Sequence, residues 1–473
     1  MNFLHRLIIG LGTASISIMG VSAQNPAALN YIKNAESREH AQTGLIVRAC
    51  ATGKTLLEYN SNQRMCPASL TKIMTTGAIL RLKGPDFHFS TRIFTTGPIQ
   101  MGTLHGDIIV YGGGDPALES HYTPLDRGRF KRELIAAIEH AGIKEITGDI
   151  WVDASRYGDE GVNPTWMVED IGNYYGTGTY GFNIFDNRIN LTLNSVGKVP
   201  QVLKANPEHP EMKWINKTTI GRDSVWCMMI PFLNQGIIYG SIPPKQKYYT
   251  LKTALPDPAT YGAVNIKTWL GQAGVKVDGK GLGAYEPLKT NQGSLVMEYN
   301  SLPLDTLLKV TNFRSVNSFA EAMMKEVETA NQPIYGQNII RPYKIEDYWK
   351  ATLGIQQEEM TLYDGCGLSP KNRITPDVLS RTLLSLMHDA NPQDNVFLHS
   401  LPRAGKEGSV RSILSDGAVE AYLKSGSMSG VLGYGGYVQN KGNWYVVVFI
   451  SNDHNSAYVM KHAFDQFVKS YFA

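Results

Sequence analysis

Three short polar motifs, far apart along the chain, place the strongest constraint on how this sequence folds. They are SLTK at 69–72, SVN at 315–317 and KSG at 424–426. A serine three residues before a lysine on a helix puts a hydroxyl and an amine on one face, about one turn apart. Such a pair can serve as nucleophile and base only if further groups bind the substrate and its oxyanion. A fold that uses all three motifs must therefore bring these distant segments together.

The first motif alone is weak evidence, because the chain also contains SVGK at 195–198. A serine–lysine pair at this spacing is expected about once or twice by chance in a chain of this length. Pro67 introduces the first motif, and apolar side chains recur behind it at helical spacing, whereas the surroundings of 195–198 show no such pattern. The order of the three motifs favours an active-serine enzyme.

Both ends of the chain predict strands of one antiparallel sheet. Residues 44–50 and 55–59 predict one hairpin, and residues 430–438 and 444–450 predict another. Residues 424–427 are expected to open the first strand of the second hairpin, and a closing helix follows over 459–471. We therefore expect an α/β (α+β) fold whose antiparallel sheet is flanked by helices, in a catalytic domain formed by 24–92 and 288–473.

The long stretch between the first two motifs predicts a large inserted region at 93–287, of one or two smaller domains. GDIIV at 106–110 and GDIWV at 148–152 resemble each other, and an amphipathic helix is expected between them at about 127–140. This pattern predicts a strand–helix–strand unit. A Pro- and Lys-rich stretch at 198–217 leads into a smaller nested piece around 195–255.

The first residues predict a signal peptide at 1–23. An apolar stretch from Leu7 to Val21 ends at Val-Ser-Ala, which has the small side chains that a signal peptidase requires. The alternative, a membrane anchor, fits less well because the stretch is short and interrupted by Gly, Ser and Thr. We expect cleavage near Ala23 and an exported, periplasmic protein without a transmembrane span.

Composition excludes several other classes of function. A net charge of +3 gives no reason to expect a nucleic-acid partner. The cysteines show no C-x-x-C spacing and the eleven histidines no metal spacing, so we expect no metal and no organic cofactor. Disulfides and buried free thiols both remain open for the four cysteines, Cys50, Cys66, Cys227 and Cys366.

The motif residues suggest a division of chemical roles. Ser69 at a helix start gains from exposed N–H groups and from the positive end of the helix dipole. Lys72 must be neutral part of the time to act as a base, and burial or a neighbouring cation such as Lys424 would lower its pKa. SFAE at 318–321 predicts a capping box, which leaves Ser315 and Asn317 in the preceding loop.

Further short motifs match one protein family along nearly the whole chain after the leader. They are PAS at 67–69, GGGDP at 112–116, NIFDN at 183–187, DGCGLS at 364–369 and NRITP at 372–376. Together with the three motifs above, they resemble the type-4 low-molecular-mass penicillin-binding proteins, the D-alanyl-D-alanine carboxypeptidase/endopeptidase family related to DacB. The resemblance implies the active-serine transpeptidase/β-lactamase-like fold with an insertion between the first two motifs.

The resemblance also implies a function and a site. Expected substrates are peptidoglycan stem peptides or cross-links, cleaved through an acyl-enzyme that penicillin and other β-lactam antibiotics also form. Ser69 would be the nucleophile, Lys72 the base and Ser315 a proton shuttle, with the backbone N–H groups of Ser69 and Ser427 as the oxyanion hole. The substrate-binding residues would be Asn317, Lys424, Ser425, Gly426 and Ser427.

Two positions depart from the family pattern, and two other functions stay open. Ser425 replaces the usual Thr but keeps the hydroxyl, and Cys366 replaces a Ser. A serine β-lactamase would share the chemistry, and a catalytically weak peptidoglycan-binding scaffold would share the fold. The sequence leaves open the balance of carboxypeptidase and endopeptidase activity, a homodimer, the pairing of the cysteines and the role of the insertion.

Overall fold

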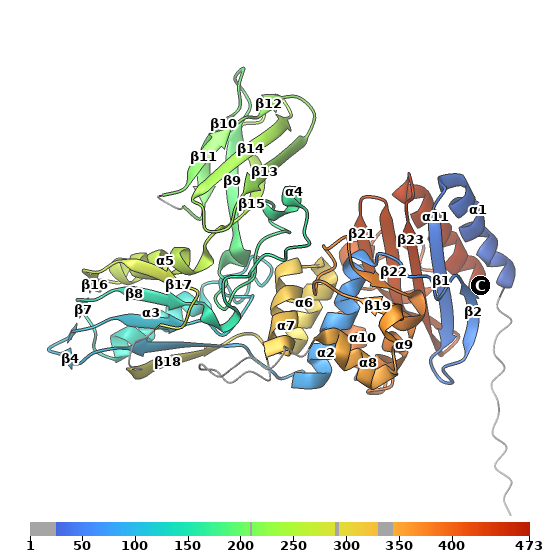
Figure 1. Cartoon of the computed structure of the whole chain (residues 1–473), viewed down its shortest axis with the longest axis horizontal. Helices are drawn as coiled ribbons and strands as arrows, with labels where there is room; N and C mark the ends of the chain where they lie inside the picture. The colour runs from blue at the N-terminus through green and yellow to red at the C-terminus, as the bar shows by residue number, and fades with distance from the viewer. Residues whose placement is uncertain (1–24, 209–210, 289–292, 330–343) are drawn as a thin grey trace, which may run out of the picture.

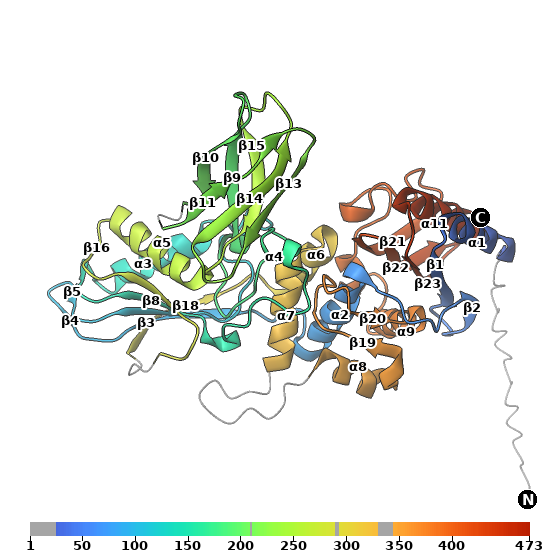
Figure 2. The same cartoon turned by 45° about the horizontal axis from the view of Figure 1, so that its top comes forward.

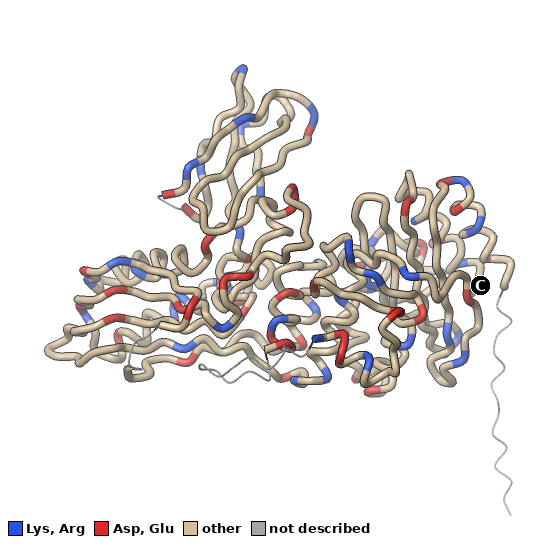
Figure 3. The backbone as a smooth tube through the Cα atoms, in the orientation of Figure 1, with Lys and Arg blue, Asp and Glu red and all other residues tan. Residues whose placement is uncertain are grey.

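The structure, a computed structural model, describes residues 25–208, 211–288, 293–329 and 344–473. The expected cleavage site near Ala23 lies outside these ranges. Within them no helix is long and apolar enough to cross a membrane. Basic and acidic residues are interspersed along every part of the chain (Figure 3).

A five-stranded antiparallel sheet joins the two ends of the chain in the order β2-β1-β23-β22-β21. Strand β1 pairs along its whole length with β23, from Gln42 opposite Asn452 to Ala49 opposite Tyr445. The expected sheet built from both termini is therefore confirmed. The strands are β1 (Gln42–Ala49), β2 (Thr55–Tyr59), β21 (Glu420–Met428), β22 (Val431–Asn440) and β23 (Asn443–Asn452).

Helices cover both faces of this sheet because successive strand residues point to opposite sides. Val447 and Phe449 pack on one face under α1 (Leu29–Glu39) and α11 (Ala457–Tyr471), whereas Val446 and Val448 pack on the other. Figure 1 shows the remaining helices of this part on that second face, between the sheet and the inserted part. They are α2 (Thr71–Lys83), α6 (Leu304–Arg314), α7 (Asn317–Thr329), α8 (Ile345–Leu353), α9 (Pro376–Met387) and α10 (Val396–Ser400), with the short strands β19 (Met360–Thr361) and β20 (Arg373–Ile374).

The inserted part is built on a second five-stranded sheet in the order β17-β8-β6-β3-β18. Strands β6 and β8 are parallel and α3 (Arg129–His140) lies between them in sequence, which confirms the expected strand–helix–strand unit. The elements are β3 (Ser90–Thr95), β6 (Ile108–Tyr111), β8 (Ile150–Asp153), β17 (Gly281–Ala284), β18 (Ser294–Asn300) and α5 (Pro258–Gln272). A small sheet of β4 (Ile99–Gln100), β5 (Thr103–Leu104), β7 (Glu145–Ile146) and β16 (Lys276–Val277) lies beside it.

Two further sheets project from the inserted part (Figure 1). One contains β9 (Arg188–Asn194), β10 (Gln201–Asn206) and β15 (Tyr249–Ala254), and the other β11 (Lys213–Asn216), β12 (Thr219–Ile220), β13 (Ser224–Met229) and β14 (Gln235–Ile242). Their buried side chains belong to the same hydrophobic cluster as the five-stranded sheet of the inserted part. Because β3 and β18 pair with each other, we propose limits for the inserted part at Ser90 and Asn300 rather than at 93 and 287.

The segment before α4 (Val168–Ile171) connects the inserted part to the catalytic part. Trp166 Nε1 donates a hydrogen bond of 2.8 Å to Asp364 Oδ2, and Thr165 Oγ1 donates one of 2.6 Å to Ser369 Oγ. Trp166 also packs against Ala320 of α7 and against Cys366. The views in Figures 1 and 2 agree that α7 lies at this junction, next to α2.

This junction generates a prediction about stability. Hydrogen bonds to charged groups contribute about 1.5–3 kcal/mol, so we expect Trp166→Phe and Asp364→Asn to show a coupling energy of about 1–2 kcal/mol in a double-mutant cycle. The measurement is urea unfolding of wild type, both single variants and the double variant. Trp349→Phe is the matched control, because its indole N–H donates to the Met74 carbonyl instead. A coupling below about 0.5 kcal/mol, the usual limit of additivity, would contradict the assignment.

Candidate active site

Ser69 lies in a short 3-10 helix, Ala68–Leu70, that runs directly into α2. The expected serine at a helix start is therefore present, and its side chain is half-buried. Ala68 has a positive φ of 46°, which is uncommon for a residue other than glycine. Gly367, with a φ of +83°, packs against this turn so closely that a Cβ would lie 1.8 Å from the Ala68 carbonyl oxygen. The backbone before Ser69 is thus fixed by a turn from a distant part of the chain.

Lys72 points from α2 into the protein and has no solvent exposure. Its Nζ lies 3.0 Å from Ser69 Oγ, 2.7 Å from Asn317 Oδ1 and 2.6 Å from the Cys366 carbonyl oxygen. Three oxygens therefore surround the amine, one from each of three separate segments. The Ser69 hydroxyl and the Lys72 amine are within hydrogen-bond distance, as the spacing of the first motif predicts.

Burial lowers the pKa of the Lys72 amine, while the Cys366 thiol and the carboxyl groups of Asp364 and Glu321 act in the opposite direction. Lys424 of β21 is equally buried. Burial lowers the pKa of Lys424 well below its usual value, and the nearby charge of Lys72 lowers it further. The site thus favours neutral amines at pH values where an exposed lysine is charged.

Ser315 and Asn317 lie where α6 ends and α7 begins. Ser315 caps α6 in the left-handed conformation, with φ 55°. Its Oγ accepts a hydrogen bond of 3.0 Å from Lys424 Nζ, so Ser315 contacts Lys424 rather than Lys72 in this structure. Asn317 Oδ1 accepts from Lys72, and Nδ2 donates to the Tyr175 carbonyl of the inserted part. Asn317 of α7 therefore connects α2 with the inserted part.

The capping box expected at 318–321 is wrong. Helix α7 begins at Asn317, so Ser318 is already helical. The side chain of Glu321 does not turn back to the helix start. Instead its Oε1 accepts from the backbone N–H groups of Gly365 and Cys366, at 2.9 and 2.8 Å.

The third motif occupies a strand of its own, β21, at the edge of the sheet, and not the first strand of the terminal hairpin. That hairpin is formed by β22 and β23. Lys424 Nζ also donates to the Ser425 carbonyl, and the Ser425 hydroxyl lies 2.6 Å from Ser409 Oγ. Gly426 faces the start of α2, where a Cβ would lie 2.6 Å from the Pro67 carbonyl and 3.1 Å from the Ser69 nitrogen. Ser427, the next residue, is exposed.

The turn at 364–367 is also part of the site. Its sequence matches the family motif at 364–369, but the sequence alone indicated no role for it. Asp364 accepts hydrogen bonds from the backbone N–H groups of Gly367 and Ser369 and from Asn372 Nδ2. The Cys366 thiol is fully buried, 3.6 Å from Asp364 Oδ2, and its pKa is raised by burial. All four cysteines, including Cys366, are buried free thiols in this structure.

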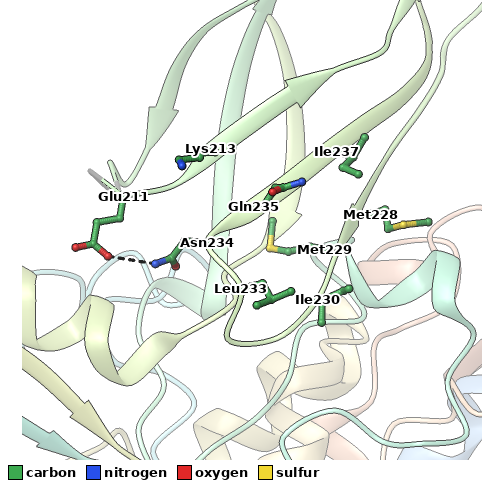
Figure 4. A pocket seen from close by; sticks show the side chains of 9 residues that line it. All are labelled: Glu211, Lys213, Met228, Met229, Ile230, Leu233, Asn234, Gln235 and Ile237. Carbon is green, nitrogen blue, oxygen red and sulfur yellow. Dashed lines mark hydrogen bonds between the residues drawn. The ribbon is translucent and has the colours of Figure 1, made fainter.

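One group of potential metal ligands occurs among the described residues, formed by Glu321, Asp364 and Cys366. Because the carboxylate oxygens named above already accept N–H groups, we assign no ion to it. A separate pocket of about 590 Å³ lies on the projecting sheet of β11, β13 and β14 (Figure 4). Its lining contains none of the motif residues; it is formed by Glu211, Lys213, Met228, Met229, Ile230, Leu233, Asn234, Gln235 and Ile237.

The chain is similar to known proteins along most of its length. The family model for the D-Ala-D-Ala carboxypeptidase 3 (S13) family matches residues 27–471. The D-alanyl-D-alanine carboxypeptidase DacB of Haemophilus influenzae is 26% identical over 85% of this chain and 83% of its own. The D-alanyl-D-alanine carboxypeptidase of an Actinomadura species is 26% identical over 88% of this chain and 79% of its own.

A solved structure confirms the expected fold. Penicillin-binding protein 4 of Haemophilus influenzae superposes with a TM-score of 0.78 over 93% of this chain and 97% of that one, at 23% identity. The same protein has also been solved in complex with a β-lactam. The active-serine, penicillin-recognising architecture expected from the motifs is therefore the fold of this chain.

The close approach of β21 to the start of α2 predicts the effect of a single methyl group. Gly426→Ala should separate the strand from Ser69, and a displacement of about 1 Å can reduce a reaction rate about a hundredfold. We expect this loss in the rate at which a fluorescent penicillin acylates the protein. Gly271→Ala is the matched control, because its Cβ would meet no atom within 4 Å and α5 tolerates alanine. Equal acylation rates for the two variants would contradict the proposed approach.

Proposed function

Because the chain belongs to the D-Ala-D-Ala carboxypeptidase 3 (S13) family, we propose that Ser69, Lys72 and Ser315 carry out its serine-type DD-peptidase reaction. The protein is a hydrolase of this class, and its relatives are D-alanyl-D-alanine carboxypeptidases. The proposed substrates are peptidoglycan stem peptides ending in D-alanyl-D-alanine, or the D-amino acid cross-links between them.

The observation that carries this proposal is the arrangement of oxygens around Lys72 Nζ. A neutral amine has two N–H donors and one lone pair. The Asn317 amide oxygen and the Cys366 carbonyl can accept the two N–H groups, at 2.7 and 2.6 Å. The lone pair is then left for the Ser69 hydroxyl proton, at 3.0 Å. Since burial favours the neutral form, Lys72 is poised to accept a proton from Ser69.

The proposed acylation step follows from these contacts. The Ser69 oxygen attacks the carbonyl carbon of the penultimate D-alanine while its proton passes to Lys72. The negative charge that develops on the carbonyl oxygen is held by the backbone N–H groups of Ser69 and Ser427. The C–N bond then breaks, and the proton that Lys72 took from Ser69 is passed to the leaving amine through the Ser315 hydroxyl, which Lys424 holds by a hydrogen bond. Lys72 is neutral again after this transfer. Water hydrolyses the resulting ester and regenerates Ser69.

The remaining motif residues are proposed to bind the substrate. Lys424 and the Ser425 hydroxyl would attract the terminal carboxylate, and the backbone of Gly426 and Ser427 at the sheet edge would pair with an extended peptide. Asn317 would bind a substrate amide in addition to orienting Lys72. The chemistry proposed here requires no metal or organic cofactor.

We also propose that the protein acts outside the cytoplasm, in the periplasm, after cleavage of a signal peptide near Ala23. The support is the apolar stretch from Leu7 to Val21 and the location of peptidoglycan in the cell wall. The chain has no helix in its described ranges that could span a membrane.

Labelling with penicillin tests the nucleophile. We expect a covalent adduct on the peptide that contains Ser69, detected by mass spectrometry after proteolysis, and no adduct in Ser69→Ala. Ser195→Ala is the matched control, since Ser195 starts the second S-x-x-K sequence, and it should label normally. An adduct elsewhere, or none in the wild type, would count against the proposal.

The released products distinguish the open alternatives. Digestion of purified peptidoglycan should release free D-alanine if the protein is a carboxypeptidase and convert dimeric to monomeric muropeptides if it is an endopeptidase. Rapid turnover of penicillin after the first acylation would instead indicate a β-lactamase. Binding of peptidoglycan without any product would indicate a scaffold.

The lowered pKa of Lys72 predicts how acylation depends on pH. The rate should rise with pH as Lys72 loses its proton, on a limb centred below the value of about 10.4 of an exposed lysine. Lys72→Ala should lose about a hundredfold or more of the rate, as expected for removal of a general base, and should lose this limb. Stopped-flow fluorescence between pH 5 and about 10 measures both effects. If the acylation rate instead rises with the pKa of an exposed lysine, the prediction of a lowered pKa for Lys72 is contradicted.

A further inference from the structure

Glu321 is a buried acid of α7, one helical turn from Asn317. Its carboxylate hydrogen-bonds to the turn at 364–367 and not to Ser69, Lys72, Ser315 or Lys424. Its Oε1 accepts hydrogen bonds from two successive backbone N–H groups, those of Gly365 and Cys366. These N–H groups belong to the same turn whose Cys366 carbonyl accepts from Lys72. The carboxyl group is therefore separated from the Lys72 amine by a single residue of backbone.

The turn at 364–367 is held tightly between α2 and α7, and Glu321 is the acceptor for two of its N–H groups. The Gly365 carbonyl accepts a hydrogen bond of 2.7 Å from Thr75 Oγ1 of α2, so the turn is held against α2 from one side. A Cβ on Gly365 would lie 2.7 Å from the Met324 side chain, which shows how closely α7 packs from the other side. Without the Glu321 acceptor, two buried N–H groups would have no partner, and the peptide planes would rotate to find one.

We propose that Glu321 is a positioning residue for the Lys72 amine. It fixes the two peptide planes that precede the Cys366 carbonyl. Asp364 fixes the next plane, which carries that carbonyl, by accepting the Gly367 N–H. The proposal rests on the proposed function of Lys72. Helix α7 then supplies one of the two oxygens that hold the amine, from Asn317, and helps to position the other, the Cys366 carbonyl, through Glu321. A lone pair directed at Ser69 requires both acceptors, because either N–H could otherwise rotate toward Ser69.

Glu321 also contributes to the charge around Lys72. The groups that face this amine are Glu321, Asp364 and Cys366, which raise its pKa, and Lys424 of β21 nearby. Burial and the charge of Asp364 raise the pKa of Glu321 to about 7, while Lys325 on the same helix acts in the opposite direction. Above that pH Glu321 is mainly ionised, so its removal should lower the pKa of Lys72.

Two substitutions separate the two effects. In Glu321→Gln the amide oxygen can accept the same two N–H groups, so the orientation survives and the charge is lost. We expect a maximal acylation rate within about threefold of wild type and an ascending limb at lower pH. In Glu321→Ala both acceptor contacts are lost, and the rate should fall about tenfold or more, with the dissociation constant of the penicillin little changed.

Glu326→Gln is the control, because Glu326 is another buried acid of α7 that binds Lys83 and Arg156 instead. It should leave the rate and its pH dependence at wild-type values, and thermal unfolding of every variant monitors the fold. If Glu321→Ala fails to fold, Glu321→Met takes its place, because methionine also removes both acceptor contacts but fills more of the space.

The proposal is overturned if Glu321→Gln and folded Glu321→Ala keep both the wild-type rate and limb. It is equally overturned if Glu326→Gln changes acylation as much as they do. A wild type that forms no adduct at Ser69 would refute the proposed function and this inference together. Normal labelling with unaffected Glu321 variants would refute the inference alone.

Discussion

The burial of two lysine amines at one place is the physical constraint on which the rest of the site depends. Removing an amine from water disfavours its charged form, so Lys72 and Lys424 both have lowered pKa values. Each buried N–H then needs an oxygen, and the oxygens come from α7, the turn at 364–367, the α6–α7 junction and β21. The proposed reactivity of Ser69 follows from that enclosure.

The same constraint explains why distant segments must pack together and what this costs in stability. The unfolded chain binds protons on these lysines at pH values where the folded protein does not, so they make the folded state less stable as the pH falls below the usual lysine pKa. The two hydrophobic clusters on the faces of the sheet offset this cost. The inserted part adds contacts at the site itself, since Trp166 binds Asp364 and the Tyr175 carbonyl binds Asn317.

Local sequence patterns predicted those strands and helices that residues close together in the sequence determine. The apolar runs at both ends of the chain, separated by turn residues, predicted the sheet, and the spacing of Ser69 and Lys72 predicted their contact. Residues 424–427 were assigned to the first strand of the terminal hairpin, because the polar sequence around the buried Lys424 does not mark β21 as a separate strand. Glu321 matched a capping box because a sequence does not reveal that its partners lie 44 and 45 residues further on. Long-range contacts of this kind depend on the assembled fold.

The proposed role of Lys72 as a base depends on a pKa that burial lowers, and a titration of this amine measures that pKa. Protein labelled with carbon-13 at lysine Cε allows each amine to be followed by NMR, with Lys72→Arg and Lys424→Arg used to assign the two resonances. We expect both signals to titrate below the value of about 10.4 of exposed lysines, and the Lys424 signal to shift when Lys72 is replaced. Two signals that titrate with the surface lysines would contradict this expectation.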